Sequence, residues 1–272
     1  MRISWATLIS VLLFGILLTL SALQTLDVVQ IIRFPAVFDF LNLPSVGIVV
    51  GGVMLHVLIS YPYREIRRAL FSFLYLFSES GLDRETFKND RRRILEWHRM
   101  YRDNRNKTRK ELSEQLTNTF EGYVFTLLNT NYTREEITDM AEIKIEERYN
   151  DKVQTSRVFQ TMGTAAPAFG MLGTLLGLII MLANFQDAEQ LGLGLSFALM
   201  TTLYGLAFAH LLLFPLATKF KVMAQHQYFR ERVMLEGILM LHEGKAPLMI
   251  HDKLGAFIST LNDDMKDLNV PR

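Results

Sequence analysis

Long apolar runs separated by charged stretches dominate the pattern of this chain. The clearest run, Met162–Ala183, has no charged residue and matches the roughly 20 apolar residues that cross a bilayer. Another run without Asp, Glu, Lys or Arg follows at Leu191–Leu216, after a short polar turn at Asn184–Gln190. Two further apolar runs occupy Ile3–Leu23 and Pro44–Ser60. The pattern predicts four transmembrane helices.

A signal peptide is the alternative interpretation of Ile3–Leu23. The run is longer than the roughly 7–15 apolar residues usual in signal peptides, and no small-x-small cleavage site follows it. We therefore interpret it as the first span. His56 lies inside the second span, where a lone histidine is either a functional candidate or a neutral packing residue. The second interpretation is favoured.

The charged stretches read as helices outside the membrane. Residues 79–157 are soluble in character, and within them 81–116 is dense in both charge signs and contains no proline, which predicts exposed helix. Thr133 and Glu136 form a capping box, and the helix that starts there is expected to run into the third span without a break. The tail, 222–272, predicts two helices with a turn at Gly244–Pro247. Residues 64–78 either lie on the membrane surface or continue the second span.

The basic residues that flank the spans predict the orientation. They lie in the long middle segment and in the tail, so these parts and both termini are expected in the cytoplasm. The resulting fold class is an all-α membrane protein with four transmembrane helices, a large helical cytoplasmic loop and a helical C-terminal tail. The predicted domains are 1–62 (spans one and two), 63–158 (cytoplasmic helical domain), 159–218 (spans three and four) and 219–272 (cytoplasmic C-terminal helices).

Composition agrees with a protein that is partly in a membrane. The chain is 50% hydrophobic and 21% charged, with a mean hydropathy of +0.17. The absence of cysteine excludes disulfides and thiolate metal sites. Arg91–Arg93 resembles a nucleic-acid-binding run, but acidic residues are interleaved around it, so we expect a partner-contacting or solvated face and no nucleic acid.

Small residues mark one face of each of the last two spans. At 100° per residue, the small and special residues of the third span share one arc, and those of the fourth span share another. They are Gly163, Pro167, Gly170, Gly173, Thr174 and Gly177 in the third span, and Gly194, Ala198, Thr201, Gly205 and Ala209 in the fourth, with Thr202 at the edge. Such faces pack helices closely in lipid, which predicts an antiparallel hairpin. Ordinary packing and a transport role are both compatible with these faces, and Pro167 and Thr174 favour transport.

No motif of an enzyme is present. The chain lacks GxSxG, GxxxxGK[ST], HExxH and GxGxxG, and its six histidines are scattered, so no enzyme, cofactor or metal site is predicted. Spans three and four contain hydroxyls but no carboxylate. Hydroxyls and carbonyls help replace the hydration shell of an ion, whereas a proton or sodium relay also needs a titratable acid. If the protein moves ions, that acid must come from another chain.

Several stretches resemble one known family. APAFGMLGTLLGLIIML resembles the third span, ALMTTLYGLAFAHLLLFPLATKF the fourth and LPSVGIVVGG the second span of the MotA/TolQ/ExbB ion-channel family. Four spans and the tail LEGILMLHEGKAPLMIHDKLGAFI resemble its MotA/PomA branch, the A subunit of bacterial flagellar stators.

The resemblance implies a multi-pass protein of the bacterial inner membrane and a homopentamer around two MotB/PomB-type subunits whose transmembrane Asp carries the ion. Ion flow would drive rotation, and the cytoplasmic loop would push the rotor protein FliG. Pro167 and Pro215 match the family's functional prolines, and Thr174 and Thr202, with Thr201 adjacent, match hydroxyl positions of the ion pathway. The glycines and Ala198 of the small faces (Gly163, Gly170, Gly173, Gly177, Gly194, Gly205) would pack against the partner.

The loop departs from the family pattern. The family's Arg followed by Gly-x-Leu-x-Leu-Glu is absent, so Arg102, Arg105, Glu111 and Glu114 are the nearest candidates for rotor contact. A related ion-driven motor for gliding, envelope energisation or defence, and a non-transporting scaffold, remain alternatives. The transported ion is H⁺ or Na⁺, and threonines at both hydroxyl positions favour Na⁺.

Overall fold

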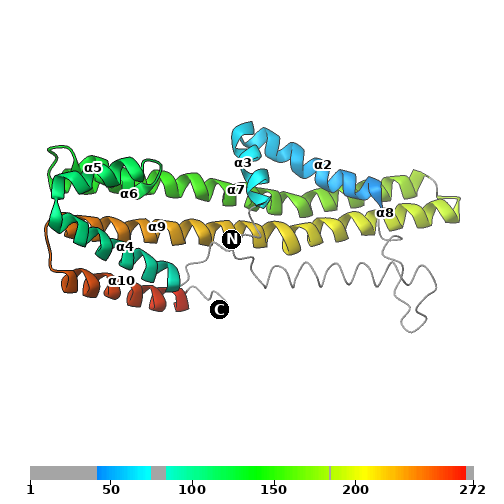
Figure 1. The fold of residues 1–272 in the computed structure, drawn as a ribbon. Helices are drawn as coiled ribbons and strands as arrows, with labels where there is room; N and C mark the ends of the chain where they lie inside the picture. The colour runs from blue at the N-terminus through cyan, green and yellow to red at the C-terminus, as the bar shows by residue number, and fades with distance from the viewer. Residues whose placement is uncertain (1–41, 75–83, 184, 268–272) are drawn as a thin grey trace, which may run out of the picture. The chain divides into compact units, whose positions relative to one another are not determined.

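The computed structural model describes residues 42–74, 84–183 and 185–267, and in these ranges all regular structure is helical (Figure 1). The predicted first span at 3–23 lies outside the described residues. In chain order the helices are α2 (Leu43–Ser60), α3 (Tyr63–Leu74), α4 (Arg84–Asp103), α5 (Arg105–Gln115), α6 (Phe120–Leu128), α7 (Arg134–Ala183), α8 (Ala188–Ala207), the π-helical stretch η3 (Phe208–Leu213), α9 (Phe214–His242) and α10 (Pro247–Asp267).

The chain divides into two compact units. We call the first the apolar unit; its described residues are 42–74, 153–183 and 185–221. We call the second the charged unit; its described residues are 84–152 and 222–267.

Helix α2 ends where a proline forces it to end. Tyr61 has extended backbone, φ −130° and ψ 148°, because the ring of Pro62 disfavours helical geometry at the residue before it. A separate helix, α3, then begins at Tyr63. Residues 64–74 therefore do not continue the second predicted span as one straight helix.

Helix α2 packs against the α7–α8 hairpin within the apolar unit (Figure 1). The ring of Phe169 lies so close to Gly52 that a Cβ built there would be 2.2 Å from the ring atom Cδ1. Hydrogen bonds hold both ends: Asn42 N donates to Tyr204 Oη over 3.0 Å, and Tyr61 Oη pairs with Thr161 Oγ1 over 2.9 Å. These contacts fix α2 against both long helices.

The capping box at the start of α7 is confirmed. Thr133 N donates to Glu136 Oε2 over 2.8 Å, and Glu136 N donates back to Thr133 Oγ1 over 3.3 Å. The pKa of the Glu136 carboxyl is held below its ordinary value because Thr133 N and, over 3.0 Å, Thr133 Oγ1 both donate to its ionised form. The helix then continues for 50 residues to Ala183, as the sequence predicted.

Helix α8 begins three residues before the predicted start of its span. Asp187 accepts hydrogen bonds from Glu189 N at 2.9 Å and Gln190 N at 3.4 Å, which makes Asp187 the N-cap and Ala188 the first helical residue. The helical run from Ala188 continues through η3 into α9 and ends at His242. The predicted turn at Gly244 is confirmed: Gly244 has φ 72°, and Lys245 N donates to Met240 O over 3.1 Å.

The charged unit has a hydrophobic core that the sequence interpretation missed. The predicted exposed helix is two helices, because Asn104 caps α5 by accepting from Lys107 N over 3.1 Å. One face of α4 is buried, and Trp97 meets Phe125 edge to face with ring centroids 5.3 Å apart. The core combines residues of α4, α5, α6, α9 and α10 with the first part of α7. Its fully buried members include Ile94, Phe125, Leu128, Ile145, Met234, Ile238, Ile250 and Leu254.

A buried ion pair joins α4 to α9 beside this core. Asp90 is 3% exposed, and the Arg230 guanidinium binds both of its carboxylate oxygens, at 2.5 and 2.8 Å. The bond to Asp90 raises the pKa of Arg230 above its ordinary value. Arg93 of the basic run lies 3.7 Å from Glu121, so part of that run pairs within the charged unit itself.

Candidate functional site

The small faces of α7 and α8 meet each other. A Cβ built on Gly177 would lie 2.7 Å from both the Cβ of Ala198 and the carbonyl oxygen of Gly194. At another point of the same helix pair, a Cβ built on Gly205 would lie 2.7 Å from the carbonyl oxygen of Ala166. The two backbones are thus in contact along the hairpin, and only glycine fits at these positions (Figure 1). The predicted antiparallel hairpin is confirmed.

This contact is the hairpin that the sequence predicted from the small faces. The partner helix predicted at the same glycines stays a prediction. Gly170, Gly173, Gly177, Gly194, Ala198 and Gly205 all lie at the α7–α8 contact, and Gly163 lies against the ring of Phe214. Thr174 and Thr202 lie beside this seam and are only half-buried.

The three candidate threonines bond carbonyls of their own helices. Thr201 is fully buried, fills the space beside Gly173 and donates to Ala198 O over 2.9 Å. Thr174 donates to Met171 O over 2.6 Å, and Thr202 Oγ1 lies 3.5 Å from Ala198 O. A hydroxyl that donates to its own helix keeps oxygen lone pairs free. Thr174 and Thr202 can therefore still offer an oxygen to an ion, whereas Thr201 is primarily a packing residue.

Pro167 lies inside α7 and is half-buried. A proline within a helix removes one hydrogen bond and pushes on the carbonyl four residues earlier, which here belongs to Gly163. Gly163 is buried and has no side chain of its own. Pro167 thus removes a backbone hydrogen bond of α7 at a position where the helix is buried.

Pro215 is exposed and is the second residue of α9, one residue after the π-helical stretch η3. Phe214 N donates to Ala209 O, five residues back, and the next residue, Pro215, has no N–H to donate. π-Helical turns are rare and are common at functional sites. The sequence interpretation missed η3, although Pro215 itself was the signal that the helix could not be regular there.

The outer faces of the hairpin are apolar. Large side chains that are more than half exposed include Leu175 and Ile179 of α7 and Leu199 and Leu203 of α8. Two helical runs, Arg134–Ala183 and Ala188–His242, are long and apolar enough to cross a membrane. Pro44–Ser60 is a shorter apolar helix. His56 is exposed on α2, so it is not a packing residue within this chain.

The candidate rotor-contact residues lie on α4 and α5 of the charged unit. Arg102, Arg105 and Glu114 are exposed, and Glu111 is half-buried and lies 3.8 Å from Lys107. Arg105 also donates to His242 O over 2.6 Å, so it caps the end of α9. Within the described residues, no group of three His, Cys, Asp or Glu side chains is placed to hold a metal ion.

Comparison with known proteins agrees with this geometry. Residues 103–232 match the model of the MotA/TolQ/ExbB proton channel family. The protein YtxD of Bacillus subtilis (strain 168), itself uncharacterised, is 31% identical over 227 residues, which cover 81% of this chain and 80% of YtxD. Motility protein A of the same organism is 28% identical over 242 residues, covering 89% of this chain and 88% of that protein.

A solved structure of the flagellar MotAB stator complex from Bacillus subtilis superposes with a TM-score of 0.71 at 27% identity, covering 89% of this chain and 93% of that one. The all-helical fold, the exposed apolar hairpin and these matches define a subunit of a membrane ion channel. The chain belongs to the MotA/TolQ/ExbB proton channel family.

Proposed function

We propose that this chain is the A-type stator subunit of a bacterial flagellar motor. With a MotB/PomB-type partner it forms an ion channel that converts ion motive force into rotation. The observation that carries this proposal is the α7–α8 hairpin, whose apolar spans contain no carboxylate and thus require an acid from another chain. The similarity to Motility protein A and to the MotAB complex over nearly the whole chain supports the same assignment.

The assembly follows from this assignment. Five copies are expected to surround two partner subunits in the bacterial inner membrane, with four spans per copy and both termini in the cytoplasm. The domain boundaries predicted from the sequence, 1–62, 63–158, 159–218 and 219–272, belong to this proposal. So does the absence of enzymatic activity, since torque needs only ion flow and contact with the rotor.

The charged unit is proposed to contact the rotor protein FliG. Its exposed α4 and α5 present both signs of charge, and surface charges of this kind orient docking more than they strengthen it. Arg102, Arg105, Glu111 and Glu114 are the proposed contact residues.

The test is complementation of a deletion strain together with purification of the complex. We expect loss of swimming on deletion, and a complex of this chain with a one-span partner that carries a membrane Asp. A deletion strain that swims normally, or a purified chain that stays monomeric with the partner present, would contradict the proposal.

A related motor for another process is the second candidate. Two observations favour keeping it: the uncharacterised YtxD is as similar as Motility protein A, and the loop lacks the family's Gly-x-Leu-x-Leu-Glu run. Deletion separates the two functions, because a non-flagellar motor leaves swimming intact and changes gliding, envelope integrity or defence instead.

A further inference from the structure

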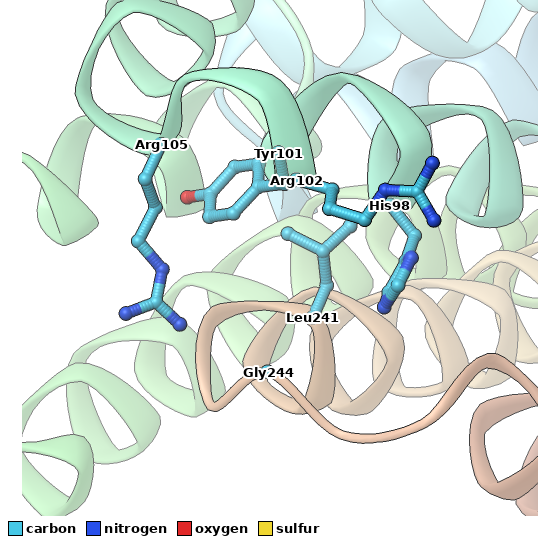
Figure 2. Close-up of a pocket in the computed structure, with 6 residues that line it drawn as sticks. All are labelled: His98, Tyr101, Arg102, Arg105, Leu241 and Gly244. Atoms are coloured by element: carbon cyan, nitrogen blue, oxygen red, sulfur yellow. The ribbon is translucent and has the colours of Figure 1, made fainter.

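A cavity of about 320 Å³ opens in the charged unit between α4 and the turn that follows α9 (Figure 2). Its size lies at the lower end of the roughly 300–1,000 Å³ of small-molecule sites. The residues that line it are His98, Tyr101, Arg102, Arg105, Leu241 and Gly244. The lining thus contains two guanidinium groups, an imidazole and a phenol, and no carboxylate.

The donors of this pocket are only partly used. Arg105 donates one bond to His242 O, over 2.6 Å, and His98 Nε2 lies 3.2 Å from Lys245 O. The other guanidinium N–H groups of Arg105 have no hydrogen-bond partner among the described residues. Arg102 is exposed and has no ion-pair or hydrogen-bond partner among the described residues. The nearby acid, Glu243, is already paired with Arg134 and Lys245.

Tyr101 supplies the observation that points to a ligand. The side chain is 6% exposed, and its hydroxyl is buried with no hydrogen-bond partner among the described residues. Figure 2 shows this hydroxyl pointing toward the Arg105 side chain. A buried hydroxyl without a partner is costly unless something in the cavity accepts from it.

The protonation states favour an anion. Burial raises the pKa of Tyr101 to about 12, despite the opposing charges of Arg109 and Arg105, so the phenol stays a donor at neutral pH. His242 lies near the same two arginines, and burial followed by their charges lowers the pKa of its imidazole. The local field is therefore positive, and the free side-chain groups of Tyr101, Arg102 and Arg105 on the pocket wall are donors.

We propose that this pocket binds a phosphate-type oxyanion, either inorganic phosphate or the phosphate group of a nucleotide. The free donors that line the cavity come from Tyr101, Arg102 and Arg105; the Tyr101 hydroxyl is turned toward Arg105, and the Arg102 guanidinium points away from it toward His98 (Figure 2). A tetrahedral anion with three or four oxygens can accept from such a set, whereas a carboxylate has only two oxygens. Planar arginine forks suit phosphate in particular.

This inference does not depend on the stator assignment, and its test needs no motility. The full-length chain, purified in detergent, is dialysed to equilibrium against labelled inorganic phosphate at constant ionic strength. Nucleoside mono- and triphosphates and acetate serve as competitors. We expect saturable binding. Tighter competition by a nucleotide would identify the ligand as a phosphorylated nucleoside and would support the same site.

Two variants and one control decide whether binding uses the pocket. Arg102→Gln removes a charged fork and is expected to weaken binding about tenfold or more. Tyr101→Phe removes only the hydroxyl and is expected to weaken binding about threefold to tenfold. Arg99→Gln, on the same helix but outside the pocket lining, is the matched control and should change binding less than about twofold. No saturable binding, equal losses for Arg102→Gln and Arg99→Gln, or acetate competing as well as phosphate would each overturn the proposal.

Discussion

Gly163 of α7 lies against the aromatic ring of Phe214: a Cβ built on Gly163 would be 2.8 Å from the ring atom Cε1. Each of the two residues lies shortly before a proline in the sequence. Gly163 is the residue whose carbonyl Pro167 frees, and Phe214 directly precedes Pro215. The two irregular points of the hairpin therefore touch each other.

Replacing either proline is expected to impair function more than stability. Pro167→Ala restores one helical hydrogen bond, worth about 1 kcal/mol, so the protein should stay at least as stable. Ion flux and swimming speed should nonetheless fall, because the helix loses the point at which it can bend. Swimming and membrane protein levels of Pro167→Ala and Pro215→Ala strains are the measurements. Normal swimming of both strains at normal protein levels would contradict the prediction.

The α7–α8 seam can be tested with one pair of glycines. Gly177→Ala places a methyl group 2.7 Å from the backbone of α8, so the helices must separate at a cost of about 1–3 kcal/mol. Gly192→Ala is the control, since no atom of the described chain lies within 4 Å of its Cβ and alanine favours helix. Thermal unfolding in detergent should show a lower midpoint only for Gly177→Ala. Equal midpoints for the two variants would mean that the seam is not closely packed.

The Asp90–Arg230 pair is expected to hold the charged unit together. Arg230→Met leaves a carboxylate that is 3% exposed without its bidentate partner, a loss of roughly 3–5 kcal/mol. Arg232→Met is the control, because Arg232 and its partner Glu142 are both about half exposed and such pairs contribute about 0–1 kcal/mol. Chemical denaturation of the two variants gives the difference. A loss below about 1 kcal/mol for Arg230→Met would show that nearby Arg93 replaces it.

The sequence predicted those parts of the fold that depend on short local patterns of residues. The capping box at Thr133 and the turn at Gly244 are short patterns with a fixed geometry, and both were predicted at the right residues. The hairpin was predictable because glycine spacing encodes a helix face. The core around Trp97 and Phe125 was not, since charged residues mask the apolar face of α4 in the sequence.

The candidate site was predicted in part for the same reason. Pro167, Thr174 and Thr202 lie on or beside the hairpin seam, as the helix pattern indicated. The π-helical stretch η3 before Pro215 depended on tertiary packing and was missed.

Charge reversals on α4 and α5 are expected to reduce torque without reducing ion flux. The candidate residues Arg102, Glu111 and Glu114 lie in the charged unit, away from the apolar spans in the sequence, so their charges act on docking rather than on the ion. Arg105→Glu also removes the cap on α9, and Arg102 lines the same pocket as Arg105, so reversal of the exposed Glu114 is the cleaner variant. Torque on tethered cells and ion flux in vesicles separate the two effects. If all reversals leave motility intact, the contact lies elsewhere, with Arg91–Arg93 the next candidate.

The transported ion is predicted from the half-buried threonines. Sodium needs several oxygen ligands to replace its hydration shell, whereas a proton needs only an acceptor and a hydrogen-bonded path. Thr174 and Thr202 each donate to or lie near a carbonyl of their own helix and keep lone pairs that a partner Asp could complement.

We therefore expect swimming speed to rise with sodium concentration at fixed pH, and Thr174→Ala and Thr202→Ala to need more sodium for half-maximal speed. The loss of one oxygen ligand should raise that concentration by about threefold to tenfold. Thr201→Ser is the matched control, since it keeps a hydroxyl at the buried position and should leave the sodium dependence unchanged. Speed that is independent of sodium and abolished by a protonophore would make the motor proton-driven and reduce both threonines to packing residues.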